Sequence, residues 1–475
     1  MRCLAGSRHG ASRNHLLLFY HAYIKSLTDY ALPVFSSAAP TNMSRLDVIH
    51  SSAMRLIAGA WRSTPLPALY CEAGVLPPYE QRLRISRIQY GKLCSSPPDH
   101  PIHKVFHQYR YITSVVFQHK QYRAPLLYRN TRIVEELNLQ DTILTPNPPN
   151  SIIPPWYPLS AVVHTTPLEH ALSTGGGQNH EIFLALVDKH FDGYQQIFTD
   201  GSLIKSQQTV LVGSAMYVLP SKERYRWKLG TEHSILAAEL YAILKGVNYA
   251  MKSLSQTVIF TDNRSALCLI ADQKPKSYKQ IVYAIHNNIL LAPQGKIKFH
   301  WVPAHTGILG NEQADKDAKT AAVSDTQPVD LPMDLKEFKS EITTKSWTHW
   351  QQKWNSLRPK YHLGTVKKSV SRDSLYNTSR KYETIFSQLR LGLTSLNKYL
   401  FRIGREDSPE CEICQQDETV EHYLLKCRRF TSERTTMLNS LPPNSNPVSL
   451  STLLLGEAVT TRSVEEYIRV TKRFD

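Results

Sequence analysis

Residues 195–322 alternate between the strand pattern and the helix pattern of hydrophobic positions. Short apolar runs predict five strands: Gln196–Thr199, Val210–Val218, Tyr225–Leu229, Thr257–Phe260 and Lys296–Trp301. Apolar residues at three- and four-residue spacing predict four helices: Ile235–Met251, Arg264–Ile270, Tyr278–Leu291 and Asn311–Ala322. The resulting order, β-β-β-α-β-α-α-β-α, indicates an α/β domain.

The flanking segments are predicted to be mainly helical and are set off by breaks. Seven prolines lie between Pro146 and Pro167, and Gly175-Gly176-Gly177 follows. Because proline fixes φ and removes a hydrogen-bond donor, we predict a linker there. A second break falls at Val323–Pro332. We therefore expect four parts: a helical domain (1–140), a Pro/Gly-rich linker (141–192), the α/β domain (193–323) and a helical C-terminal region (324–475).

Composition narrows the class of protein. Of the 475 residues, 41% are hydrophobic and 20% are charged, which is typical of a globular chain. No apolar run approaches the ~20 residues that a membrane span needs, so we expect no membrane attachment. Most of the seven cysteines are scattered singly, as in a reduced protein, and we therefore expect an intracellular location.

The net charge of +16 indicates a polyanionic partner, with nucleic acid as the first candidate. Residues 1–140 hold 17 basic and 7 acidic side chains, and residues 195–322 hold 15 and 9. The excess therefore lies mostly in these two blocks. A soluble basic surface without a ligand is the alternative interpretation.

Four acidic residues of the α/β domain are candidates for catalysis. Asp200 and Asp262 each follow the apolar run of a strand, so neighbouring strands would bring both carboxylates to one sheet edge. Glu239 lies in an apolar helical stretch, where an unpaired carboxylate is unfavourable. Asp315 lies near the start of the last helix. Gathered together, the four would repel one another, and Mg²⁺ or Mn²⁺ would remove that conflict.

Phosphodiester hydrolysis is the chemistry that uses such a cluster. Two metal ions about 4 Å apart can activate a water and stabilise the leaving 3′ oxygen. His305, ten residues before Asp315, could relay protons or help product release. Each residue alone has a plainer interpretation, such as a turn aspartate, a solvated glutamate or a structural histidine. The order of all of them together favours catalysis.

These motifs resemble those of type 1 ribonuclease H domains. The matching segments are Phe198–Ser202, Ala238–Leu240, Phe260–Asn263 and Trp301–Lys319. The resemblance implies a mixed five-stranded sheet with flanking helices, and the following site residues: Asp200, Glu239, Asp262 and Asp315 as Mg²⁺ (or Mn²⁺) ligands, and His305 as the loop histidine. It also implies two-metal endonucleolytic hydrolysis of the RNA strand of an RNA–DNA hybrid, leaving a 3′-hydroxyl and a 5′-phosphate.

Two departures from that pattern bear on substrate binding. Ala304 stands where many members have glycine, which would stiffen the loop. The chain between Asp262 and His305 is too short for the basic helix with which some members grip the hybrid. We expect affinity to depend on other basic surface, first of all that of residues 1–140. Recognition through backbone and shape, rather than base edges, is expected.

The first block resembles the segment after the reverse-transcriptase palm of Jockey-type non-LTR retrotransposons. The segments that carry this resemblance are Leu17–Tyr30, Leu46–Trp61, Ser63-Thr64-Pro65 and Leu69–Leu76. It implies a C-terminal part or derivative of such a polyprotein, with a thumb- or connection-like first domain. Residues 1–190 hold no paired-aspartate polymerase motif, so we predict no polymerase activity. The alternatives are a catalytically inactive nucleic-acid-binding remnant and an architectural protein whose zinc-binding tail contacts other proteins.

The C-terminal region contains a cysteine–histidine motif at 411–427. Cys411, Cys414, His422 and Cys427 supply three thiolates and an imidazole, which form a full tetrahedral zinc set. The spacing resembles a zinc knuckle with a longer central segment. We predict a structural Zn²⁺, and a reduced cysteine pair with a surface histidine is the alternative. Acidic neighbours in this motif argue against the knuckle itself dominating phosphate contact.

Overall fold

The computed structural model describes these residues: 1–6, 9–35, 38–97, 99–105, 144, 153–154, 156–159, 162–164, 179–205, 209–371, 378–443, 448–455 and 458–475. Gly175–Gly177 and most of the predicted proline-rich linker lie outside them. The described residues fall into two compact units. One takes its residues from 1–89 and 342–475, and the other from 90–113 and 131–341. The second unit contains the α/β domain.

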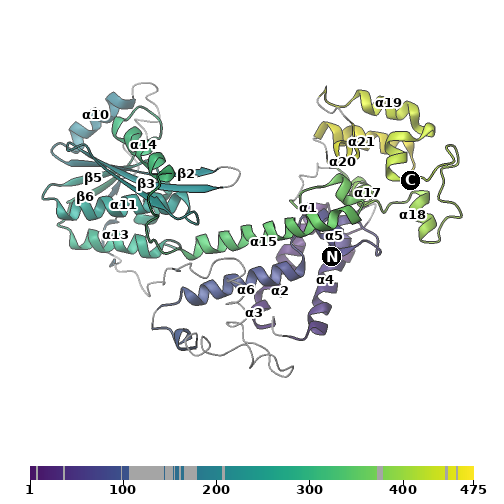
Figure 1. Cartoon of the computed structure of the whole chain (residues 1–475), viewed down its shortest axis with the longest axis horizontal. Helices are drawn as coiled ribbons and strands as arrows, with labels where there is room; N and C mark the ends of the chain where they lie inside the picture. The colour runs from purple at the N-terminus through teal and green to yellow at the C-terminus, as the bar shows by residue number, and fades with distance from the viewer. Residues whose placement is uncertain are drawn as a thin grey trace. The chain divides into compact units, whose positions relative to one another are not determined.

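A mixed sheet forms the centre of the α/β unit, with strand order β1-β6-β5-β2-β3-β4 (Figure 1). The strands are β1 (Val163–His164), β2 (Gln195–Lys205), β3 (Val210–Leu219), β4 (Glu223–Leu229), β5 (Thr257–Thr261) and β6 (Ile297–Trp301). Strands β2, β3 and β4 pair antiparallel, whereas β2, β5 and β6 pair parallel. The five predicted strands are confirmed, and the two-residue β1 adds a sixth beside β6.

Helices cover both faces of this sheet (Figure 1). They are α10 (Asn179–His190), α11 (Ile235–Lys252), α12 (Arg264–Ala271), α13 (Lys279–Leu291) and α14 (Leu309–Val323). Residues of α11, α12 and α13 pack on one face around Ile197, Ile259 and Phe299. Side chains of α10 and α14 pack on the other face around Phe198 and Phe260. This alternation along β2 and β5 explains why their apolar runs are continuous.

Strand β2 is longer than its sequence pattern predicts. The apolar run ends at Thr199, yet the strand continues to Lys205 because it pairs with β3 as far as Lys205↔Val210. The parallel pairing with β5 stops earlier, at Thr199↔Thr261. Asp200 therefore lies inside a strand, at the point where the partner on one side ends.

Helices from both ends of the chain build the other unit, except for their residues 90–94 and 335–341, which belong to the α/β unit. The N-terminal ones are α1 (Arg13–Phe19), η2 (Tyr20–Lys25), α2 (Ser26–Tyr30), α3 (Leu32–Phe35), α4 (Pro40–Ala58), α5 (Leu66–Ala73) and α6 (Pro78–Cys94). The C-terminal ones are α15 (Leu335–Leu357), α16 (Leu363–Val366), α17 (Arg380–Leu391), α18 (Asn397–Arg402), η7 (His422–Lys426), α19 (Thr431–Asn439), α20 (Leu450–Leu455) and α21 (Ala458–Thr471). Among the described helices, none has both the length and the apolar composition that crossing a membrane demands.

One hydrophobic core joins these two groups of helices. Leu16, Met54 and Leu69 from the first group share it with Trp354 and Leu391 from the second. The C-terminal helices also build a core of their own around Phe386, Tyr423 and Tyr467.

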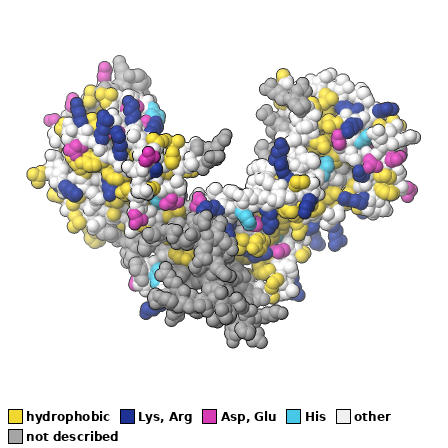
Figure 2. Space-filling model, viewed as in Figure 1, with side chains coloured by type: hydrophobic (Ala, Val, Ile, Leu, Met, Phe, Trp, Pro, Cys, Tyr) yellow, Lys and Arg dark blue, Asp and Glu magenta, His cyan; other side chains and the backbone are white. Residues whose placement is uncertain are grey.

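Basic and acidic side chains both reach the molecular surface on the face seen in Figure 2.

A buried charge cluster ties the same two groups together. Glu72 is fully buried, and Arg13 Nη1 donates to its Oε1 at 2.8 Å. Arg390 Nη1 lies 3.5 Å from that oxygen, and Ser387 Oγ donates to it at 3.0 Å. Burial alone would raise the pKa of Glu72, yet the two arginines hold it below its usual value. The charge is thus stabilised by residues from both ends of the chain.

Candidate active site and metal centre

Asp200 and Asp262 leave the sheet side by side. Strands β2 and β5 are parallel neighbours whose last pair is Thr199↔Thr261, and each aspartate is the next residue. This arrangement confirms the expected meeting of the two strand ends at one edge. Asp200 is buried and Asp262 is half-buried.

Glu239 approaches the two aspartates from α11. The helix can come close because Gly201 of β2 has no side chain: a Cβ there would lie 2.7 Å from Glu239 N and 3.0 Å from Ala238 Cβ. Ser234 caps the helix, its hydroxyl accepting from Ala237 N at 3.2 Å. Glu239 follows in the second turn and is 2% exposed. The Asp-Gly pair after the apolar run therefore reflects a close crossing of helix and strand, not a turn.

The structure brings three of the four predicted carboxylates into one group. One oxygen each from Asp200, Glu239 and Asp262 lies within 4.8 Å of the others. Burial and the neighbouring charges of Asp262 and Asp315 raise the pKa of Asp200 to about 8. Burial and the same kind of repulsion raise the pKa of Glu239 well above its usual value. Glu239 Oε2 is buried without a hydrogen-bond partner in the part of the chain that the structure describes.

Asp315 belongs to an adjoining group. An oxygen of Asp315, one of Glu312 and a ring nitrogen of His305 lie within 4.8 Å of one another. Asp315 Oδ2 accepts from Lys319 Nζ at 2.7 Å, which is an i,i+4 pair on α14. Its charge still reaches the first group, since it helps to raise the pKa of Asp200. The fourth carboxylate is therefore next to the other three, with its own partners.

His305 lies exposed on the loop between β6 and α14. Its φ of 54° places a non-glycine residue in the left-handed region, which is typical of functional loops. Gly307 also has positive φ, and Thr306 Oγ1 donates to Pro303 O at 3.0 Å. The charge of His305 works against the effect of burial, which raises the pKa of Asp262.

Two residues that hold Asp262 were not singled out from the sequence. Asn311 is 3% exposed, and its Nδ2 donates to Asp262 Oδ2 at 3.2 Å. Trp301 Nε1 donates to Asp262 O at 3.0 Å. The available signal for Asn311 is its position four residues before Asp315, on the same face of α14. Trp301 ends β6, on the side of β5 opposite to β2, whereas Asn311 reaches the aspartate from α14.

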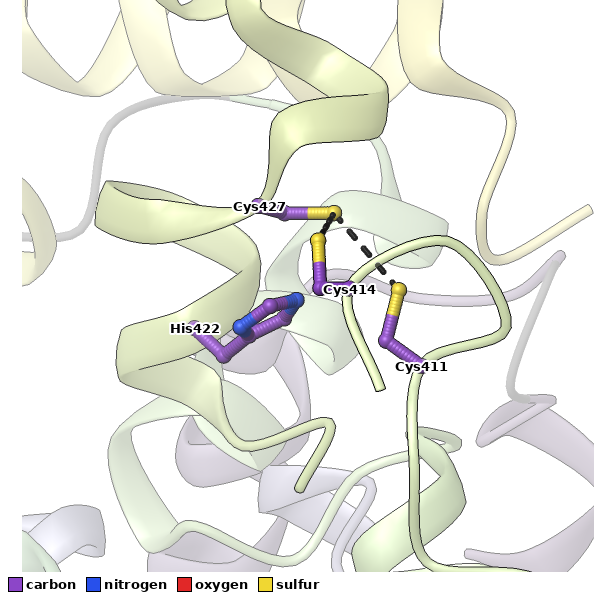
Figure 3. A group of neighbouring side chains, drawn as sticks. All are labelled: Cys411, Cys414, His422 and Cys427. Carbon is purple, nitrogen blue, oxygen red and sulfur yellow. Dashed lines mark hydrogen bonds between the residues drawn. The ribbon is translucent and has the colours of Figure 1, made fainter. Parts of the chain in front are cut away.

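The cysteine–histidine motif also comes together in space (Figure 3). One atom each of Cys411, Cys414, His422 and Cys427 lies within 4.8 Å of the others. Cys427 Sγ is 3.8 Å from Cys411 Sγ and 3.9 Å from Cys414 Sγ. His422 is 4% exposed, and within the described residues its Nε2 has no hydrogen-bond partner. All four predicted ligands thus converge.

Local contacts prepare these groups to bind a metal. Arg428 N donates to Cys414 Sγ at 3.2 Å, which lowers the pKa of that thiol. Burial lowers the pKa of His422, so the imidazole is neutral near pH 7 and has a lone pair to offer. Burial raises the pKa of Cys427 to about 12, and a cation would be needed to keep it as thiolate.

A comparison with known proteins bears on the α/β unit. A family model described as RNase H matches residues 192–323. The foamy viral protease-reverse transcriptase, solved in complex with an RNA/DNA hybrid, is 19% identical with a TM-score of 0.25, over 28% of this chain and 20% of that one. In its structure with dsDNA, the match has 20% sequence identity and a TM-score of 0.25, and it covers 28% of this chain and 96% of that one. The solution structure of the PFV RNase H domain matches with 20% sequence identity and a TM-score of 0.24, and the match covers 27% of this chain and 93% of that one.

The family match and the observed sheet agree on the same segment. The matched residues begin just before β2 and end at the last residue of α14. They include all five residues predicted to form the catalytic site: Asp200, Glu239, Asp262, His305 and Asp315. Residues 192–323 of this chain are therefore an RNase H domain.

Proposed function

We propose that residues 192–323 hydrolyse the RNA strand of RNA–DNA hybrids. The observation that carries this proposal is the group of Asp200, Glu239 and Asp262, three carboxylates within 4.8 Å on an RNase H fold. Without cations such a group is unfavourable, as the raised pKa values of Asp200 and Glu239 indicate. Cations bound there would offset the repulsion between the carboxylates and would thereby stabilise the folded domain.

The donor set fits Mg²⁺ or Mn²⁺. The donors are hard carboxylate oxygens, and Glu239 Oε2 is buried with no partner in the described structure. Asp200, Glu239, Asp262 and Asp315 are the residues that would hold two such cations. When bound, such cations polarise the phosphate and lower the pKa of a water.

Other residues of the chain would orient the site and carry protons. Asn311 and Trp301 hold Asp262 at its carboxylate and its carbonyl. His305 is exposed beside Asp315 and Glu312, so its ring can exchange a proton with solvent. We propose that it assists proton transfer or product release. The hybrid would be recognised through its backbone and shape.

A substrate panel tests this function. The full chain is incubated with Mg²⁺ and end-labelled RNA as hybrid, single strand or RNA duplex, beside a DNA duplex. We expect cleavage of RNA in the hybrid alone, with 3′-hydroxyl and 5′-phosphate ends. Binding of the hybrid without any cleavage would instead support the catalytically inactive remnant.

We also propose a retroelement setting for this activity. The Jockey-type motifs of residues 17–76 support it, together with the RNase H domain downstream. In that setting the enzyme would remove the RNA template after reverse transcription. The test is whether the purified chain degrades RNA in a hybrid that a reverse transcriptase has just synthesised. Persistence of the RNA would count against this role.

We propose a second, structural site for Zn²⁺ at Cys411, Cys414, His422 and Cys427. Its support is the convergence of all four donors, with a buried His422 Nε2 that no described group satisfies (Figure 3). Three sulfurs and one nitrogen are a closed tetrahedral set. Purified wild type should contain one zinc per chain, and Cys414→Ser should contain far less. Equal zinc content in both would remove the proposal.

A further inference from the structure

A single carboxylate, that of Glu337, lies at the start of two helices. Glu337 is buried in the first turn of α15, and its Oε1 accepts from Ser234 N at 2.7 Å. Its Oε2 accepts from Asp334 N at 3.2 Å. Ser234 is the N-cap of α11, and Asp334 directly precedes α15. Glu337 therefore supplies an acceptor at the start of both helices, where backbone N–H groups have no partner within the helix.

His233 turns this contact into an ion pair. Its Nδ1 lies 3.2 Å from Glu337 Oε2, and both side chains are buried. Burial alone would lower the pKa of His233, but the hydrogen bond and the charge of Glu337, together with the charge of Glu232, raise it above its usual value. Burial alone would raise the pKa of Glu337, but His233 and the N–H of Ser234 hold it below its usual value. The two groups therefore carry opposite charges between pH 4.5 and pH 6.5.

The segment that leads to α15 also packs against α11 and the edge strand β4. Val329 N donates to Lys228 O of β4 at 2.9 Å. Val329 and Leu331 pack against a cluster that includes Ala238 of α11. Both residues follow the RNase H match, which ends at residue 323. The chain beyond the matched domain therefore continues to contact the helix that carries Glu239.

The place of Glu239 depends on how α11 is held at its start. Ser234 Oγ accepts from Ala237 N at 3.2 Å, and Glu239 follows in the next turn, a rise of about 7.5 Å from Ser234. At Gly201 the helix lies so close to β2 that a Cβ would be 2.7 Å from Glu239 N. A small shift or tilt of α11 would therefore move the glutamate relative to the two aspartates of the carboxylate site.

We propose that Glu337 is a positioning residue for the carboxylate site. By holding Ser234 it fixes the start of α11, and it thereby keeps Glu239 beside Asp200 and Asp262. This inference rests on the proposed function and adds to it a residue from outside the matched segment. The unit that carries the activity would then extend at least as far as the first turn of α15.

Three substitutions of Glu337 in the full chain separate the reach of its side chain from its charge. Glu337→Gln keeps an oxygen at the same reach and loses the charge, Glu337→Asp keeps the charge on a shorter side chain, and Glu337→Ala loses both. The matched control is Asp330→Ala, which removes an exposed carboxylate from the segment before α15. Each protein is measured well below its melting temperature, so that lower stability alone does not change the result.

The first measurement is hydrogen exchange of the amides in the first turns of α11, at residues 238–243. We expect exchange at least about tenfold faster in Glu337→Ala than in wild type, because α11 loses a charged hydrogen bond at its start. Glu337→Asp should show a smaller increase, whereas Glu337→Gln and Asp330→Ala should match wild type. Equal exchange in all variants would show that Glu337 does not hold the helix, and it would overturn the proposal.

The second measurement is the Mg²⁺ dependence of hybrid cleavage. In Glu337→Ala we expect kcat to fall about tenfold or more and the half-saturating Mg²⁺ concentration to rise, because small misplacements at a reacting centre are costly. Glu337→Asp should lose less, Glu337→Gln should stay close to wild type, and KM for the hybrid should change little. Faster exchange with unchanged kcat and Mg²⁺ dependence would mean that Glu337 serves stability alone, and it would overturn the positioning role. If Glu337→Ala does not fold, the comparison of Glu337→Asp with Glu337→Gln decides in the same way.

Mg²⁺ binding without cleavage separates this inference from the proposed function. The rise in melting temperature on adding Mg²⁺ needs no turnover, and its midpoint should move to higher Mg²⁺ in Glu337→Ala and Glu337→Asp. If the wild type binds Mg²⁺ but does not cleave, the proposed function fails and this midpoint still decides whether Glu337 positions the site. A wild type that neither binds Mg²⁺ nor cleaves would overturn both.

Discussion

Asp262 is held by contacts from three elements of the candidate site described above. Asn311 and Trp301 donate to its carboxylate and carbonyl, and β5 positions its backbone beside Asp200. The carboxylates that face it have raised pKa values, so the geometry is kept against repulsion. At the residue scale, neutral neighbours therefore fix Asp262 beside carboxyl groups that repel one another when they are ionised.

Asn311→Ala should weaken catalysis without unfolding the domain. Loss of the amide frees one oxygen of Asp262, and outer partners of metal ligands are typically worth about 10–100-fold in activity or affinity. We expect a fall of that size in the cleavage rate and a higher Mg²⁺ requirement. Asn248→Ala, which removes an exposed amide from α11, is the control. Equal rates for both variants would contradict the positioning role.

The metal-free protein should lose stability as the pH rises. The folded-state pKa of Asp200 is about 8, against an ordinary value of 3.8, so the folded chain keeps a proton that the unfolded chain releases. The stability that this proton contributes is greatest at low pH and is lost as the pH rises from 3.8 to about 8. We expect the melting temperature of the metal-free protein to decrease between these pH values, and we expect Mg²⁺ to raise it most at the alkaline end. The slope should be smaller in Asp200→Asn, and a melting temperature independent of Mg²⁺ would contradict the account.

Much of this site could be predicted from the sequence, and the limits have physical causes. The apolar runs of β2 and β5 locate Asp200 and Asp262, because a buried parallel strand leaves a continuous pattern. The true end of β2 was missed, since its last residues pair only with β3 on one side. Asn311 and Trp301 were missed because their roles depend on contacts between distant elements. Such contacts leave no periodic signal.

At the scale of elements, α17 is anchored to the N-terminal helices by polar contacts. Arg380 Nη1 donates to Ile57 O at 2.8 Å, and Gln388 Nε2 donates to Gly59 O at 2.8 Å, at the C-terminal end of α4. Cations near the last carbonyls of a helix are favourable. The Glu72 cluster adds a second connection through Arg390. These contacts link elements more than 300 residues apart in sequence.

Glu72→Ala should strongly destabilise this helical unit. The change leaves the buried Arg13 and Arg390 without their shared carboxylate, and breaking a buried pair in this way costs about 3–5 kcal/mol. Urea unfolding of the full chain should show an early transition. Glu466→Ala removes an exposed ion pair with Arg469 and should have no such effect. Coincident midpoints for the two variants would refute the argument.

The acidic residues of the cysteine–histidine motif are paired with basic side chains, so their number alone is a weak predictor of how the motif would meet a phosphate. Asp417 lies 2.8 Å from Lys398, Glu421 lies 2.7 Å from Lys426, and Arg473 Nε donates to Glu418 at 2.8 Å. Lys398 and Arg473 lie outside the motif, so their pairing was not visible from its spacing. The four proposed ligands, by contrast, could be read from residue type and spacing alone, because zinc ligation depends on both.

At the scale of the whole molecule, the RNase H unit lies in sequence between the two segments that form the helical unit. Residues 1–89 and 342–475 share a core, while the sheet and its helices have cores of their own. The four-part organisation predicted from composition shifts stays a prediction. The shared core could not be predicted from the sequence, because the local hydrophobic patterns around Leu69 and Trp354 do not indicate which distant residues these side chains contact.

The two units should differ in their independence. A fragment of residues 153–341 should fold cooperatively and keep hybrid cleavage, because its cores are internal. A fragment of residues 342–475 keeps the core around Phe386, Tyr423 and Tyr467, but Trp350 and Trp354 lose the apolar residues that cover them. Circular dichroism melts check the first fragment, and tryptophan fluorescence should show water-exposed indoles in the second. Fluorescence typical of buried indoles in the second fragment would contradict the shared core.

The function proposed for the buried carboxylate group is cleavage of RNA in a hybrid. Its most direct test is the cleavage rate of a labelled hybrid at increasing Mg²⁺ for wild type, Asp262→Asn and Asp188→Asn, the last an exposed aspartate on α10. We predict saturable, Mg²⁺-dependent cleavage by wild type and Asp188→Asn, and a loss of more than about 100-fold in Asp262→Asn, beyond the effect of an outer partner. Equal rates for Asp262→Asn and wild type, or no Mg²⁺-dependent cleavage in wild type, would contradict it.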